Sequence, residues 1–67
     1  MMRKFTTREL AQACAKEVGW RQKVYPRLIR EGKLTQAAGD RQIAMMAEAA
    51  DVLAEMADKE DEKERLL

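Results

Sequence analysis

The sequence predicts an all-α protein folded as a two-helix antiparallel hairpin. Of its 67 residues, 46% are hydrophobic and 37% are charged, and there are one Pro and three Gly. This composition is typical of long helices. A helix start at Thr6 and a turn at residues 31–35 divide the chain into two helical stretches. We expect one domain over residues 1–67, with a first helix over about 7–31 and a second over about 36–58.

The first helix is marked by a capping signal. Thr6-Thr7-Arg8-Glu9 fits a capping box, in which the Thr6 hydroxyl accepts from the Glu9 amide and the Glu9 carboxylate accepts from the Thr6 amide. Phe5 and Leu10 occupy the two positions of a hydrophobic staple. Together these features predict a helix that begins directly after Thr6.

An apolar stripe runs along the first helix and should face the second. Its members share one side of a 3.6-residue wheel: Leu10, Cys14, Val18, Tyr25, Leu28 and Ile29. Arg21 projects into this stripe. An arginine there either extends past the packing into water or binds a carboxylate, and we expect the first of these.

Pro26 interrupts the hydrogen bonding of the first helix, because proline has no amide to donate to residue 22. Its ring also disfavours the helical conformation of the preceding Tyr25. We therefore expect a kink near residues 22–26. Because the apolar stripe resumes in phase at Leu28, one bent helix is favoured over two separate ones.

Residues 31–35 carry the signals of a helix end followed by a helix start. Gly32 is placed to adopt a left-handed conformation and end the first helix. Thr35 is placed to cap the second helix, although Ala38 stands where Glu or Gln would complete a capping box.

The second helix has two apolar seams. An inner seam with alternating spacings of three and four should face the first helix, and comprises Ile43, Met46, Ala50, Leu53 and Ala57. An outer seam lies beside it and comprises Met45, Ala49, Val52 and Met56. One seam is enough for a hairpin, so we interpret the outer seam, together with Trp20, as an oligomer or partner interface. The alternative is that a bent first helix covers both seams.

Charge is divided between the two halves of the chain. Residues 1–34 carry nine Lys or Arg against three Glu, and residues 35–67 carry four against nine Asp or Glu, so the halves are +6 and −5. Such halves attract each other when they pack antiparallel. From residue 58 to residue 67 the apolar pattern gives way to charged residues, and we expect a solvated helix extension that frays.

The sequence argues against an enzyme and against a bound metal or cofactor. It contains no His, and it has no glycine-rich phosphate loop. Cys14 has no partner for an internal disulfide and lies on the apolar stripe, where a small buried side chain is the usual role. No apolar run of the kind found in signal peptides or membrane spans is present, so we expect a cytoplasmic protein with no membrane partner.

Nucleic-acid binding is the alternative to a protein-interaction role. Four cations gather on the face opposite the apolar stripe and form a basic ridge: Lys16, Lys23, Arg27 and Arg30. Such a ridge can follow a phosphate backbone, with Trp20 at its edge to stack on a base. The competing interpretation is an ordinary solvated helix face.

Residues 21–46 resemble a group of short phage and prophage proteins that are usually described as hypothetical. The resemblance is carried by Val24-Tyr25-Pro26-Arg27-Leu28, Glu31-Gly32-Lys33-Leu34-Thr35 and Asp40-Arg41-Gln42-Ile43-Ala44-Met45-Met46. Ala38-Gly39 departs from it, since an acidic residue is expected there. It implies a phage or prophage origin, a bacterial host and no established activity.

A core as small as this chain allows is usually reinforced by association. We therefore expect a homo-oligomer, specifically a dimer forming a four-helix bundle, that acts as a protein-interaction or regulatory module. By analogy with other small phage proteins, its partner would be a host or phage protein.

Overall fold

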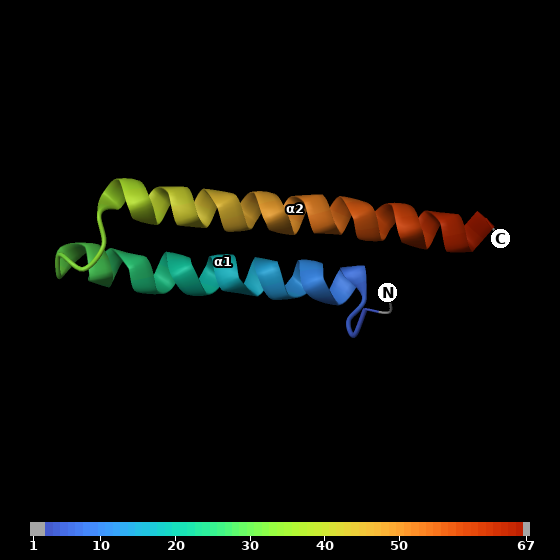
Figure 1. Cartoon of the computed structure of the whole chain (residues 1–67), viewed down its shortest axis with the longest axis horizontal. Coiled ribbons are helices and arrows are strands. Elements are labelled where there is room, and N and C mark those ends of the chain that lie inside the picture. The colour runs from blue at the N-terminus through green and yellow to red at the C-terminus, as the bar shows by residue number, and fades with distance from the viewer. Residues whose placement is uncertain (1–2, 67) are drawn as a thin grey trace.

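The computed structural model describes residues 3–66, which form two antiparallel helices, α1 (Thr7–Arg30) and α2 (Gln36–Leu66) (Figure 1). The predicted all-α hairpin is confirmed, and the described residues contain no strand. The molecule measures 53 × 19 × 19 Å and has a radius of gyration of 15.5 Å. A compact domain of this length would have a radius of about 11 Å. The hairpin is thus a thin rod, and its two helices meet along a single line.

The predicted capping box starts α1. Thr6 has extended backbone angles, its hydroxyl accepts from the Glu9 amide at 3.0 Å, and its own amide donates to Glu9 Oε1 at 3.0 Å. Donation from the Thr6 amide holds the pKa of the Glu9 carboxyl below its usual value. Phe5 and Leu10, the predicted staple pair, line one shared hollow.

The turn between the helices is a Schellman motif. The Gly32 amide donates to the Ile29 carbonyl at 3.1 Å, and the Lys33 amide donates to the Leu28 carbonyl at 2.9 Å. Gly32 has φ +73°, the left-handed conformation that the sequence predicts. After it, the Ala38 amide donates to the Thr35 hydroxyl at 3.1 Å, so Thr35 caps α2 as expected.

Pro26 lies inside α1, four residues before its end, and the helix continues through it. The expected continuity is therefore confirmed. Figure 1 shows α1 as one helix that runs beside α2. The degree of bending stays a prediction.

The contact between the helices is built from small residues. Among the described residues, the buried ones are Thr7 and Ala11 of α1 and Gly39, Ala50 and Ala57 of α2. The larger residues of the stripe and the inner seam, such as Val18 and Ile43, are only half-buried. The spacing between packed helices depends on the side chains at their contact, so small residues bring the two backbones close together.

Gly39 is closely packed at the turn end of the hairpin. A Cβ at this position would lie 3.3 Å from a methyl group of Leu34 and 3.4 Å from atoms of Ile29 and Tyr25. The resemblance to phage proteins led us to expect an acidic side chain near here, and the structure explains the glycine instead: little room remains for a side chain.

Leucine at Gly39 is expected to destabilise the hairpin by about 1–3 kcal/mol, because it would overpack this contact. Leucine at Gly19 is the matched control, since nothing lies within 4 Å of an added Cβ there. That change should be neutral or slightly stabilising, because leucine favours a helix interior more than glycine does. Urea unfolding of both variants measures the difference, and equal effects would show that Gly39 is not sterically constrained.

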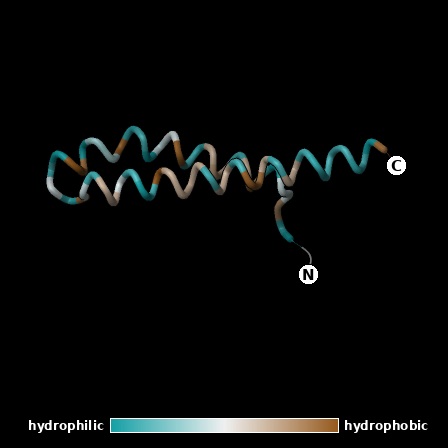
Figure 2. Tube along the Cα trace, turned by 90° about the horizontal axis from the view of Figure 1, so that it is seen from above, coloured by the Kyte–Doolittle hydropathy of each residue, from teal (hydrophilic) through white to brown (hydrophobic). Residues whose placement is uncertain are grey.

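The second helix is longer than predicted. We expected it to end at about residue 58, but α2 continues to Leu66, and Leu67 lies outside the described residues. The fraying of this segment stays a prediction. Figure 2 shows the hydrophilic last turns of α2 running past the start of α1. The sequence alone did not reveal that the beginning of α1 contacts Asp58, Glu60 and Asp61 of this segment.

A polar clasp ties the two ends together. Arg8 Nη2 binds Asp58 Oδ1 at 2.7 Å and Asp61 Oδ2 at 2.9 Å, and these hydrogen bonds raise the pKa of the guanidinium. Beneath them, the Thr7 hydroxyl donates to Glu60 Oε1 at 3.0 Å, and Thr7 itself is only 1% exposed. Exposed ion pairs contribute little to stability by themselves. The buried contact of Thr7 and Ala57 therefore contributes most of the stability of the clasp. The ion pairs fix which residues of α2 lie beside Arg8.

Replacing Arg8 with glutamine is expected to loosen α2 beyond Asp58. Its backbone amides should exchange with solvent several-fold faster, while amides near the turn should keep their rates, because only the end of the hairpin opens. Arg27→Gln is the control: it removes the same charge from an exposed pair with Glu31 at the other end. Hydrogen exchange followed residue by residue makes the comparison, and unchanged rates beyond Asp58 in Arg8→Gln would mean that the clasp does not order this segment.

Candidate interaction surface

The hairpin has two different sides. Successive helix residues turn by about 100°, so residues on either side of the buried contact face opposite directions. The clasp of Arg8 with Asp58 and Asp61 lies on one side, which we call the clasp side. The outer seam of α2 lies on the other, which we call the apolar side.

On the apolar side, the outer seam is open to solvent. The exposed fraction is 52% for Met45, 50% for Val52 and 44% for Met56, and Ala49 is half-buried. α1 thus covers the inner seam and leaves the outer one open, as the prediction of an interface requires. The alternative, in which α1 covers both seams, is wrong.

Helix α1 extends this apolar surface. Leu10, Ala13 and Val24 lie on its apolar side, and Trp20, which is 61% exposed, lies at the outer margin. Phe5, Glu9, Leu10 and Ala13 line an open hollow of about 320 Å³. The prediction of an interface named Trp20 but missed this hollow, because one of its lining residues, Phe5, precedes the helix and its position does not follow from helical periodicity.

Arg21 sits in the middle of the apolar side and is paired. Its Nε donates to Glu17 Oε1 at 3.0 Å, and its Nη1 donates to the Gln42 carbonyl at 3.1 Å. Its side chain is only 19% exposed. Our expectation that Arg21 extends past the packing into water is wrong, because Glu17, one turn earlier, supplies a carboxylate and α2 supplies a carbonyl.

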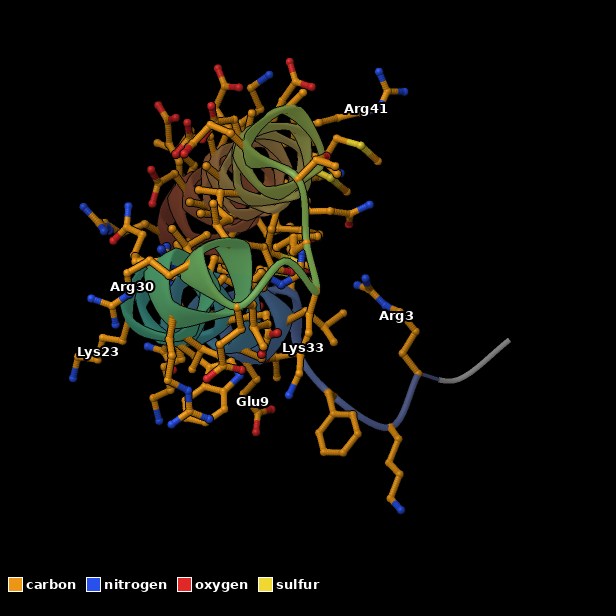
Figure 3. All side chains as sticks on the ribbon, turned by 90° about the vertical axis from the view of Figure 1, so that its left-hand side faces the viewer. Arg3, Glu9, Lys23, Arg30, Lys33 and Arg41 are labelled. Carbon is orange, nitrogen blue, oxygen red and sulfur yellow. The ribbon has the colours of Figure 1, made fainter. Side chains whose placement is uncertain are left out.

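The outward faces of the two helices carry opposite charge. All four residues of the basic ridge on α1 are exposed, and Figure 3 shows Lys23 and Arg30 pointing outward. The outward face of α2 carries an exposed acidic edge, made of Glu48, Asp51, Glu55 and Glu62. The structure therefore separates the two charges onto opposite edges of one hairpin.

The described residues hold no group of three or more His, Cys, Asp or Glu side chains arranged to bind a metal ion. Cys14 is a free, half-buried thiol on the helix contact. In the part of the chain that the structure describes, no helix has an apolar stretch long enough to cross a membrane. The apolar side and the charged edges are thus the chemical features that stand out.

Comparison with known proteins adds nothing to this description, since no protein-family model, curated protein or solved structure matches the chain. A proposal of function for this chain therefore rests on the geometry of the hairpin alone. It brings four of the predicted interface residues, Met45, Ala49, Val52 and Met56, onto one continuous surface, with Trp20 at the margin on the other helix.

Proposed function

We propose that this protein is a small protein-interaction or regulatory module that works as a homodimer, with two hairpins forming a four-helix bundle. The observation that carries the proposal is the half-exposed outer seam of Met45, Val52 and Met56. A contiguous apolar surface of this kind on a small domain is the usual mark of a protein interface.

The thinness of the monomer supports association. No residue larger than Thr7 is fully buried among the described residues, so the hairpin alone excludes little apolar surface from water. Burying one Met or Val side chain contributes roughly 1.5–3 kcal/mol. A second copy that covers the exposed half of the outer seam therefore adds stability to the hairpin.

The residue types also suit binding to proteins. Methionine adapts its shape to a facing surface, and tryptophan is enriched among residues that dominate binding energy. In this proposal the dimer is the working unit, and a host or phage protein is its target, in line with the resemblance of residues 21–46 to short phage proteins. The cytoplasm of a bacterial host is the proposed location.

Nucleic-acid binding remains the second proposal, and it rests on the exposed basic ridge. Exposed cations are common on any solvated helix face, and Arg27 also pairs with Glu31 at 3.5 Å. Half-exposed methionine, valine and tryptophan side chains on one surface are less common than exposed cations, so they are the stronger indication of a binding site. The interaction module is therefore the better supported of the two.

Static light scattering at low micromolar concentration tests the dimer. The chain is expected to have twice its own mass. Met45→Gln combined with Val52→Gln should raise the dissociation constant at least roughly a hundredfold, because four buried apolar side chains per dimer are lost and each 1.4 kcal/mol corresponds to tenfold.

Ala44→Gln is the matched control, since Ala44 is exposed on α2 but lies outside both seams. It should leave the dimer intact. A wild-type chain that is folded by circular dichroism and strictly monomeric would overturn the proposal. If the Met45→Gln and Val52→Gln variant still dimerises, the outer seam is not the dimer interface.

A further inference from the structure

We infer that the two copies associate with their turns at the same end, so that α2 of each hairpin packs antiparallel on α1 of the other. This inference rests on the proposed dimer and specifies its geometry. It places Met45 of one copy against Trp20 of the other, and Met56 and Val52 over the hollow at Phe5, Leu10 and Ala13.

Two-fold symmetry leaves two ways to stack the apolar sides face to face. If the symmetry axis runs parallel to the helices, the turns lie at the same end and α2 faces the other copy's α1. If the axis crosses the helices, the turns lie at opposite ends, α1 faces α1 and α2 faces α2. Both arrangements cover the outer seam, so exposure alone does not choose between them.

Charge chooses between them. α1 carries six Lys or Arg against two Glu, a net charge of +4, and α2 carries four Lys or Arg against nine Asp or Glu, a net charge of −5. With the turns at the same end, each helix has only neighbours of opposite charge, and the acidic edge of α2 runs beside the basic ridge of the other copy. With the turns at opposite ends, helices of like charge pack together, which costs free energy.

The heights of the exposed residues along the rod agree with this choice. Val18 and Ala47 line one small hollow together with Ala15 and Ala50, which fixes the heights at which α1 and α2 residues meet. A symmetry axis parallel to the helices keeps those heights for the other copy.

At these heights Trp20 is level with Met45, and Ala13 is level with Val52. Leu10 lies within one residue of the level of Met56. The large exposed apolar residues of α2 therefore meet apolar residues of α1 at three successive levels, where Trp20 and Ala13 are exposed and Leu10 is half-buried.

Arg21 fits the middle of this interface. It is already paired with Glu17 and with the Gln42 carbonyl within its own hairpin. Covering a charged pair costs least when its hydrogen bonds are already made. The pair can therefore be buried by the second copy without leaving an unpaired charge.

Distance measurement between spin labels tests the arrangement in the full-length chain. Cys14 is first replaced by serine, and a label is attached to Lys33→Cys at the exposed turn or to Lys63→Cys near the other end. With the turns at the same end, both label pairs should lie within about 20 Å, the scale of neighbouring and diagonal helices in a bundle.

With the turns at opposite ends, the Lys33→Cys labels would lie about 50 Å apart, from the helical rise of 1.5 Å per residue. That result in a protein that light scattering shows to be dimeric would overturn the inference and leave the proposed dimer standing. Absence of any coupling between labels in a folded, monomeric protein would overturn both. Helical content by circular dichroism checks the fold of each variant. If the label at Lys33→Cys perturbs the fold, the label at Lys63→Cys is used.

Discussion

The close contact of small residues between the two helices determines most other features of this molecule. Thr7, Ala11, Gly39, Ala50 and Ala57 let the backbones approach along one line. Because that line accepts only small side chains, the larger methionines of α2 and Val52 lie beside it or beyond it. A hairpin built in this way is thin, and it leaves apolar surface that a bulkier core would have covered.

Local signals were enough to predict the helices. The capping box at Thr6 and Glu9, the left-handed Gly32 and the cap at Thr35 each involve residues close in sequence, so their chemistry can be read without knowing the fold. The inner seam was also predictable, because a spacing of three and four specifies one face of a helix.

Contacts between the helices were not predictable in the same way. The clasp joins Arg8 to residues 50 and 53 positions away, and Arg21 reaches a carbonyl 21 positions away. Both depend on the position of one helix along the axis of the other. The turn and the contact of small residues together determine this position. For this reason the contacts that α2 makes beyond Ala57 and the pairing of Arg21 emerged only from the structure. The predicted outer seam needed only periodicity, and its exposure agrees with an interface.

The charge pattern favours some arrangements of the helices over others. A basic and an acidic helix attract each other within the hairpin, and the same attraction acts between copies when opposite helices meet. In the dimer that we propose, apolar area supplies the tendency to associate and charge supplies the orientation. We propose that this association is what makes the hairpin stable.

The dependence of the melting temperature on protein concentration tests that claim most directly. Association coupled to folding makes the midpoint of thermal unfolding depend on protein concentration. A hundredfold increase in concentration raises the free energy of unfolding of the associated state by about 2.7 kcal/mol. The account predicts a rise of several degrees, since 1 kcal/mol shifts the midpoint by roughly 4–8 °C in domains of this size. A melting temperature that stays constant over this range would contradict it.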